Sequence, residues 1–186
     1  MKKENQRIMI TRRLLKENLI ELLKEKSIDK ISVTELCQRA EINRSTFYAH
    51  YSVPKDVLLE IKWDFAAQIA ESLRSLGENA TPKDAIRRIC ELIAENAGLE
   101  RIILSNSDDD EATEAAFGNV FGMWNIAAPF ISDRNLSEDA RRLVTVFFHQ
   151  GFFRVIREWI IHEIPIKPVE IADIFSDILF NQAENS

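Results

Sequence analysis

The stretch "NRSTFYAHY", residues 43–51, brings guanidinium, hydroxyl, phenol and imidazole groups together within nine positions. A stretch so rich in polar and aromatic side chains has three possible structural interpretations. It can be an ordinary short polar helix, part of a catalytic site, or a surface that touches another molecule. The residues on either side of the stretch decide which of these the chain favours.

Two short helices are predicted around a tight turn. Ser32 followed by Glu35 is the signature of a capped helix start, and apolar residues at 33, 36, 37 and 40 have helical spacing. "AEIN" then gives a turn, and Asn43 is a good N-cap for the next helix. These are the parts of a helix-turn-helix unit, whose second helix enters the DNA major groove with its first residues at the base edges.

The side chains of the second helix fit that role. Arg44 can bind a guanine edge through two hydrogen bonds, and Ser45 and Thr46 are short enough to reach bases or phosphates. Tyr48 and His50 are typical of phosphate contacts. Phe47 and Tyr51 are expected to anchor this helix on the helices before and after it. A short polar helix without special function is the competing interpretation.

Charge is distributed unevenly along the chain. Residues 1–56 hold 12 Lys and Arg against 8 Asp and Glu, whereas the remaining 130 residues hold 12 against 22. A basic segment on an acidic body favours a local polyanion site, because phosphate neutralisation supplies much of the affinity for DNA. Chance alone can also produce such a split.

Long stretches without a helix breaker predict an all-α fold. The 186 residues include only 5 Gly and 5 Pro, and 46% are apolar, which is ample for a packed core. We expect about nine helices in two parts. Residues 1–53 form a three-helix DNA-binding domain, and residues 54–186 form a larger regulatory and dimerisation domain, with helix 54–76 joining the two. The predicted helices span about 8–26, 33–40, 43–51, 54–76, 82–97, 99–105, 108–130, 137–162 and 168 onward.

The last two predicted helices are apolar on more than one side. "RLVTVFFHQGFFRVIREWII" (142–161) is apolar around most of its circumference, and "VEIADIFSDILF" (169–180) carries two apolar stripes. A helix of this kind must be covered on both sides, either deep within one chain or by a second subunit. We expect a symmetric dimer, the commonest such assembly. Its candidate interface residues are Phe147, Val155, Trp159, Ile171, Ile174, Phe175 and Ile178.

The sequence "ISVTELCQRAEINRSTFYAHYSVPKDVLLEI" (31–61) resembles the N-terminal DNA-binding domain of TetR/AcrR-family transcriptional regulators. The "TFYAHY" core with "DVLLEI" at the right distance is fairly specific, and the resemblance covers residues 8–61. It implies that Arg44, Ser45 and Thr46 contact bases and backbone, and that Tyr48 and His50 contact phosphate. It also implies a DNA-facing position for Thr34.

Three positions depart from the family pattern. Glu41 stands where the turn usually has Gly, which costs on the order of 1 kcal/mol if that site needs a positive φ. Val33 replaces a frequent phosphate-binding Thr. Pro54 replaces a common phosphate-contacting Lys, and Lys55 follows one residue later.

The resemblance implies a homodimeric regulator that binds a palindromic operator in double-stranded DNA. It favours a repressor over an activator. In this family a small molecule bound by the larger domain releases the DNA; here its identity is unknown, and we expect it to be apolar or aromatic. Plain core positions are the alternative interpretation of the residues that could line its pocket. These candidates are Phe117, Phe121, Trp124, Asn125, Phe148, His149 and Phe152.

An enzyme is the main competing class, but the chain lacks GxGxxG, P-loop, HExxH and GxSxG motifs. His50, His149 and His162 lie far apart in sequence, and neither Cys has metal or redox spacing. We therefore expect no enzyme, cofactor or metal. Without a signal peptide or a membrane span, we expect a cytoplasmic protein. The alternative function is a helical adaptor or ligand sensor with the same fold that does not bind an operator.

Overall fold

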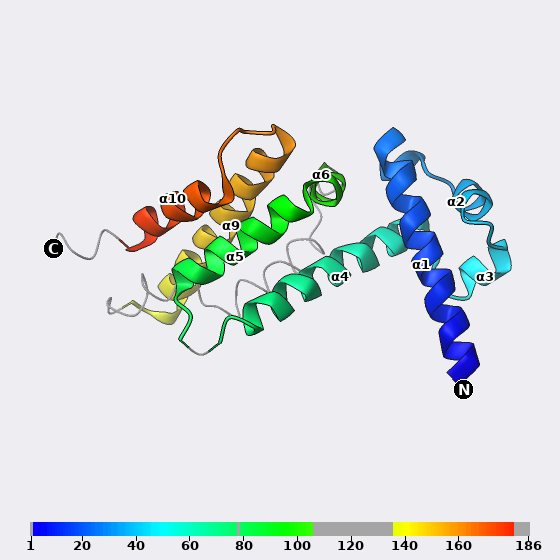
Figure 1. The fold of residues 1–186 in the computed structure, drawn as a ribbon, viewed down its shortest axis with the longest axis horizontal. Helices are drawn as coiled ribbons and strands as arrows, with labels where there is room; N and C mark the ends of the chain where they lie inside the picture. The colour runs from blue at the N-terminus through cyan, green and yellow to red at the C-terminus, as the bar shows by residue number, and fades with distance from the viewer. Residues whose placement is uncertain (1, 78, 106–135, 181–186) are drawn as a thin grey trace. The chain divides into compact units, whose positions relative to one another are not determined.

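The computed structural model describes residues 2–77, 79–105 and 136–180 (Figure 1). The all-α prediction is confirmed: these residues form eight α-helices and one 3-10 helix, and none of them is in a strand. The helix predicted at about 108–130 lies outside the described residues. The elements are α1 (Lys2–Glu25), η1 (Ile28–Lys30), α2 (Val33–Arg39), α3 (Arg44–Tyr48), α4 (Pro54–Arg74), α5 (Pro82–Glu95), α6 (Ala97–Ser105), α9 (Glu138–Ile161) and α10 (Pro168–Phe180).

The chain divides into two compact units. Unit 1 comprises Met1–Asp64 with Ile102–Asp109, and unit 2 comprises Phe65–Arg101 with Asp110–Ser186. The division therefore falls inside α4, the helix that was predicted to join two domains. A domain boundary between residues 53 and 54 stays a prediction.

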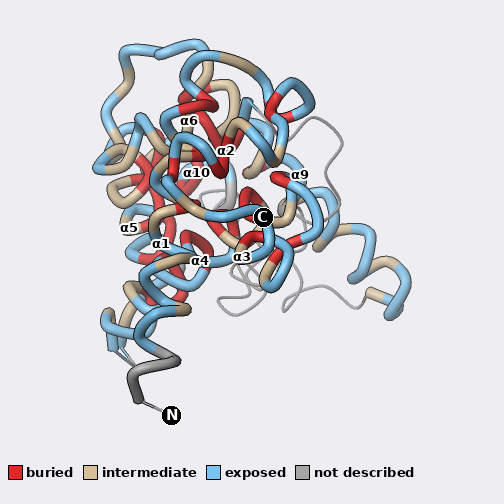
Figure 2. Tube along the Cα trace, turned by 90° about the vertical axis from the view of Figure 1, so that its right-hand side faces the viewer, coloured by how far each residue is buried: buried red, intermediate tan, exposed pale blue. Residues whose placement is uncertain are grey.

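The core of unit 1 is built on one face of α1, where Leu15, Leu19 and Leu22 repeat at helical spacing and are almost fully buried. Apolar side chains of the other elements are buried with them, and Figure 2 colours all buried positions red. Ser32 Oγ accepts a hydrogen bond from the Glu35 backbone N–H, as the capping signature predicts. The buried apolar residues from η1 to the first half of α4 are Ile28, Ile31, Leu36, Cys37, Ala40, Phe47, Tyr51, Val57, Leu58 and Ile61.

The turn between α2 and α3 is a Schellman motif with an unusual residue. The Ile42 N–H donates to Cys37 O at 2.9 Å, and the Glu41 N–H donates to Gln38 O at 3.3 Å. This pattern requires a left-handed residue directly after the helix cap, a place that usually holds Gly. Glu41 occupies it with φ 55°. The positive φ considered from the sequence is thus present, and a side chain with a Cβ sits in it.

The same arrangement ends α9. The Ile164 N–H donates to Trp159 O at 3.1 Å, and the Glu163 N–H donates to Ile160 O at 3.4 Å. Glu163 is left-handed with φ 47°, so both of the described non-glycine residues with positive φ are glutamates at a helix end. The backbone of Glu163 is therefore fixed by the end of the helix.

Unit 2 is organised by α5 and α10, which pack side by side (Figure 1). Thr81 and Asp84 form a full capping box that fixes the start of α5: the Thr81 N–H donates to Asp84 Oδ2 at 2.8 Å, and the Asp84 N–H donates to Thr81 Oγ1 at 3.2 Å. Lys83 pairs with Asp173 of α10 at 2.9 Å. The buried residues on the two helices are Ala85, Ile86, Ile89, Cys90, Ile93, Ile171, Ala172, Phe175 and Ser176.

Both cysteines are free thiols within these cores. Burial raises the pKa of Cys37, although the nearby Arg44 charge lowers it in part. Burial also raises the pKa of Cys90, to about 12. The sequence placed both residues on apolar helix faces, and the structure confirms this.

Replacing Glu41 by Gly is expected to stabilise the protein by about 1 kcal/mol, because Gly adopts positive φ without a Cβ clash. For a chain of this size, that corresponds to a rise of roughly 2–4 °C in Tm, measurable by thermal unfolding followed by circular dichroism. Glu41→Ala is the matched control, since it removes the charge but keeps the Cβ. An equal gain in both variants would mean that charge, rather than backbone strain, limits stability here.

Candidate functional site

The predicted recognition helix is shorter than the stretch that suggested it. α3 spans only Arg44–Tyr48, with Asn43 at the N-cap position, where its side chain makes no capping hydrogen bond. His50 and Tyr51 follow the helix. Asp56 Oδ2 then accepts hydrogen bonds from the Ser52 and Val53 N–H groups at 2.7 and 3.0 Å. This carboxylate ties down the start of α4 and leaves little chain between the two helices.

The predicted anchors are confirmed. Phe47 is fully buried, and Tyr51 is buried with its ring 5.7 Å from that of Phe47. The Tyr51 hydroxyl reaches both neighbouring helices: it accepts from Arg12 Nε of α1 at 3.3 Å and donates to Glu60 Oε2 of α4 at 2.7 Å. Sequence spacing indicated the apolar contact but not these hydrogen bonds.

All of the predicted DNA-contacting residues keep some access to solvent. Arg44 and Tyr48 form a pair along α3, with the guanidinium carbon 5.9 Å from the ring centroid, and hydrogen bonding to Tyr48 raises the pKa of Arg44. The Arg44 side chain is thus held along the helix. Contact of these residues with DNA stays a prediction. The exposed ones are Thr34, Arg44, Ser45, Tyr48 and Lys55, and the half-buried ones are Thr46 and His50.

Several basic side chains of unit 1, on or near the helix-turn-helix, are paired with acidic side chains. Lys26 pairs with Glu35, Arg39 with Glu25 at 2.8 Å, and Lys55 with Asp29 at 2.7 Å. Exposed pairs such as Lys55–Asp29 contribute little stability, about 0–1 kcal/mol. This pair links η1 to the first turn of α4, and contact of Lys55 with phosphate stays a prediction.

Glu60 is the centre of a polar cluster on α4. Its carboxylate accepts hydrogen bonds from the Tyr51 hydroxyl, from Lys16 Nζ at 2.9 Å, and from Arg12 through Nε at 3.1 Å and also through Nη2. Lys16 also pairs with Asp64 at 2.6 Å. One carboxylate thereby joins α1, Tyr51 between α3 and α4, and the first half of α4.

These contacts set the ionisation of Glu60. Burial raises the pKa of the carboxyl group, but hydrogen bonds from Tyr51, Lys16 and Arg12 together outweigh burial, so the net pKa lies below the usual 4.5. Because the folded-state pKa is the lower one, Glu60 stabilises the fold above about pH 4.5. That stability is lost as pH falls through the depressed value.

The structure separates the predicted interface residues into two groups. Trp159, Ile171 and Phe175 are buried within unit 2, and the ring of Phe175 lies 4.4 Å from that of Phe152. These three contribute to the core of the protomer. Four others are exposed: Phe147 and Val155 on α9, and Ile174 and Ile178 on α10.

Most of the predicted pocket-lining residues are not placed. Phe117, Phe121, Trp124 and Asn125 lie outside the described residues, and His149 belongs to α9 but its side chain is not described. Phe148 is half-buried with its ring 5.4 Å from that of Phe147. Phe152 is a core residue packed on Phe175. A ligand site formed by this set stays a prediction.

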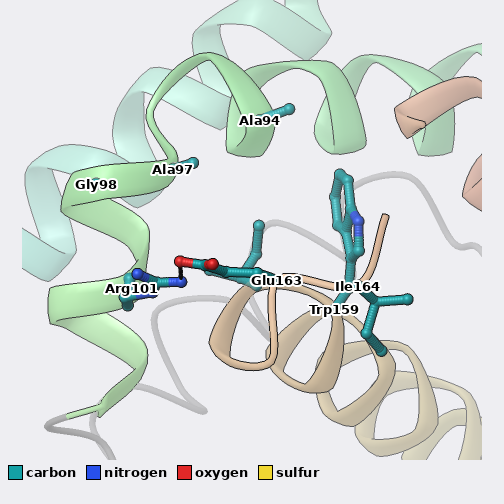
Figure 3. Close-up of a pocket in the computed structure, with 8 residues that line it drawn as sticks. Ala94, Ala97, Gly98, Arg101, Trp159, Glu163 and Ile164 are labelled. Carbon is teal, nitrogen blue, oxygen red and sulfur yellow. Dashed lines mark hydrogen bonds and ion pairs between the residues drawn. The ribbon is translucent and has the colours of Figure 1, made fainter. Parts of the chain in front are cut away.

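A cavity of about 310 Å³ lies elsewhere in unit 2, where α5 meets α6 and α9 ends (Figure 3). Its apolar wall comes from both sides: Ala94, Ala97 and Gly98 on one, and Trp159, Ile160 and Ile164 on the other. Arg101 and Glu163 complete the lining and form an ion pair. Figure 3 shows their charged ends pointing toward each other.

Sequence reasoning missed this cavity for a clear reason. Arg101 and Glu163 are 62 residues apart and belong to no recognisable motif. Trp159 was assigned to the dimer interface, because an aromatic on a largely apolar helix gives no sign of which side it faces. The sequence offered one indication of this site: in "GLERIIL" (98–104), Arg101 stands among apolar residues.

Among the described residues, no helix is long and apolar enough to cross a membrane. In the same part of the chain, no three His, Cys, Asp or Glu side chains are grouped so that they could hold a metal ion.

Comparison with known families identifies the larger part of the chain. Residues 80–181 match a TetR model described as the C-terminal region of transcriptional regulators. This match covers more than half of the chain, and with the N-terminal helix-turn-helix it leaves one conclusion. The chain belongs to the TetR family of transcriptional regulators, a non-enzymatic family. None of the curated proteins compared with the chain matches it.

Solved structures share the fold at low sequence identity. A TetR-family transcriptional regulator from Syntrophomonas wolfei is 18% identical with a TM-score of 0.69, covering 100% of this chain and 97% of that one. The dihydroxyacetone kinase operon activator DhaS is 18% identical with a TM-score of 0.62, covering 95% and 97%. The repressor FadR from Thermus thermophilus, solved with lauroyl-CoA, is 19% identical with a TM-score of 0.60, covering 90% and 92%.

Replacing Glu60 by Gln is expected to lower the free energy of unfolding at pH 7 by about 2 kcal/mol, because the hydrogen bonds lose their charge. The difference from the native protein should shrink below about pH 4.5, where protonation removes the same charge from Glu60. Urea unfolding of both proteins between pH 3 and pH 7 measures this.

Glu17→Gln is the matched control for this experiment, since Glu17 makes only an exposed pair with Arg13 on α1. It should leave the unfolding free energy within about 0.5 kcal/mol of the native value at both ends of the pH range. A constant difference between Glu60→Gln and the native protein across this range would contradict the role given to the Glu60 charge.

Proposed function

We propose that this regulator acts as a homodimer, binds a palindromic operator through α3, and is released from it by a small ligand. The observation that carries DNA binding is the α2–turn–α3 unit. Its inner residue Phe47 is buried, while Arg44, Ser45 and Tyr48 remain exposed on the outer side. Such a division leaves the first turn of α3 available to base edges in the major groove.

The proposal of a dimer is supported by exposed apolar side chains on the last two helices. Leu143, Phe147 and Val155 of α9, with Ile174 and Ile178 of α10, are large apolar residues left in solvent. Exposed apolar side chains that gather into a patch usually mark an interface. A dimer also suits the proposed operator, because its two half-sites lie about one turn of DNA, ~34 Å, apart.

Ligand release is supported by the cavity of unit 2 and by the structural relatives. FadR of Thermus thermophilus was solved with lauroyl-CoA, and FadR of Bacillus subtilis with stearoyl-CoA. A ligand can shift the protein away from its DNA-binding state only if it binds the other state more tightly. The ligand of this chain is proposed here to be a small molecule with a substantial apolar part.

Between repression and activation, we favour repression. An operator-bound dimer blocks a promoter by occupancy alone, whereas an activator needs a further surface for the polymerase. The relatives include examples named for each mode, namely the activator DhaS and the repressor NalD of Pseudomonas aeruginosa. A regulator of either kind works on cytoplasmic DNA.

Footprinting of the region upstream of the protein's own gene tests the proposal. A protected, two-fold symmetric site with two half-sites is expected, and the affinity should weaken steeply with salt. Absence of protection at low salt would favour the alternative of a helical adaptor or ligand sensor that does not bind an operator.

Replacing Arg44 by Ala is expected to reduce discrimination at one base pair of each half-site by about 10- to 100-fold, because a bidentate contact is lost. Lys55→Ala is the matched comparison, since it should weaken binding to all sequences alike and lower the salt dependence by about one phosphate contact. Fluorescence anisotropy with operator and single-substitution duplexes measures both. Equal losses on all duplexes for Arg44→Ala would place Arg44 at phosphate instead.

Replacing Phe147 by Glu is expected to convert the dimer to a monomer at micromolar concentration, because a charge would be buried in the interface. Sedimentation velocity measures the change. Val53→Glu, which alters an exposed apolar residue of unit 1, should leave the dimer intact. If the native chain itself sediments as a monomer, the dimer and the half-site argument both fail.

A further inference from the structure

We propose that the cavity beside Trp159 binds a small monocarboxylate with an apolar chain or ring, and that the ligand's carboxylate replaces Glu163 on Arg101. The cavity is lined by Arg101 and Glu163 together with apolar surface from α5, α6 and the end of α9. It shares only Trp159 with the residues that the sequence analysis assigned to a site. Figure 3 shows the elements that surround it.

The charge of the lining selects the ligand. Arg101 is the one cation among the lining residues, and Glu163 is the one anion. A guanidinium binds a planar carboxylate through two parallel hydrogen bonds, so one Arg suits a singly charged carboxylate. A phosphate with two charges would need a second cation, which this lining does not provide.

The existing partner of Arg101 can be displaced. The side chains of Arg101 and Glu163 are 43% and 70% exposed, so the ion pair between them is solvated and weak. Glu163 is also held in the left-handed region at the end of α9. Its backbone position comes from the Schellman hydrogen bonds rather than from Arg101, and the side chain can leave Arg101 without unwinding the helix end.

The rest of the lining suits an apolar group. The Trp159 indole N–H already donates to Ile166 O at 3.0 Å, so its ring offers the cavity an apolar surface without an unsatisfied donor. A Cβ on Gly98 would meet no atom within 4 Å, which leaves open space above α6. The volume lies at the lower end of the roughly 300–1,000 Å³ range of small-molecule pockets, which favours a short chain or a single ring.

Ala97 and Gly98 also place the first turn of α6 at the cavity. The last turns of α5 and α9 reach the same cavity, so the helix ends together add no net attraction for an anion, and that attraction comes from Arg101. If the ligand controls DNA binding, as the proposed function requires, this cavity is where it acts. The binding itself can be measured without DNA, so the two ideas can be tested separately.

The experiment uses the intact purified chain with hexanoate, octanoate and decanoate, followed by isothermal titration calorimetry and by tryptophan fluorescence. Octanol is the uncharged comparison and octylamine the cationic one. Saturable binding of one site per chain is expected for a carboxylate, with octanol and octylamine bound at least tenfold more weakly.

Three variants sharpen the test. Glu163→Gln should bind the carboxylate more tightly than the native chain, because the internal competitor is gone. Arg101→Gln should bind it about 10- to 100-fold more weakly, the fold-change for a lost charge-assisted hydrogen bond. Gly98→Leu should also weaken binding by filling the cavity, and it should not unfold α6, because Leu is a better helix former than Gly.

Lys83→Gln is the matched control, since it breaks an ion pair of the same unit with Asp173, away from the cavity lining, and should leave affinity unchanged. The proposal is overturned if no carboxylate binds the native chain or Glu163→Gln, or if Arg101→Gln binds as tightly as the native chain. Saturable binding with these variant effects but without any change in operator affinity would support the site. That result would reject ligand release through this cavity.

Discussion

The carboxylate of Glu60 is the constraint on which the packing of α1, α3 and α4 in unit 1 depends. A group that is only 18% exposed must find donors for its charge, and it finds them on Arg12, Lys16 and Tyr51. Arg12 and Lys16 lie on α1, and Tyr51 lies between α3 and α4. A short helix such as α3 makes few hydrogen bonds of its own. Its orientation therefore depends on the buried side chains of Phe47 and Tyr51 and on the hydrogen bonds of the Tyr51 hydroxyl.

The same cluster changes how the basic N-terminal region is understood. A count of charges along the sequence treats all cations as available for phosphate, yet Arg12 and Lys16 are used inside unit 1. Lys55 and Arg39 make exposed pairs that can be exchanged. Arg44 has an aromatic partner in place of an acid, so no carboxylate has to leave when it meets an anion. A count of charges along the sequence therefore does not show which cations remain available to a polyanion.

Much of the fold could be predicted from local signals. Apolar spacing located α1, α4, α5, α9 and α10 to within a few residues, apart from an earlier start of α1. The capping residue Ser32 marked a helix start that the structure confirms. The Gly-to-Glu departure at residue 41 correctly raised the question of a positive φ. Long-range features were out of reach, because contacts such as Tyr51–Glu60 and Arg101–Glu163 have no periodic pattern. The sequence of α10 likewise shows two apolar faces, but it does not show which of them packs against the rest of the same protomer.

The burial of the two thiols has a consequence for the signals that this regulator can receive. Thiolate is the form of cysteine that reacts with peroxides and disulfides, and its abundance depends on the pKa. Burial raises the pKa of Cys90 to about 12, so the thiol form prevails there at neutral pH. Cys37 is also buried with a raised pKa. Burial and a raised pKa therefore make both thiols poor reactants toward oxidants in the folded protein.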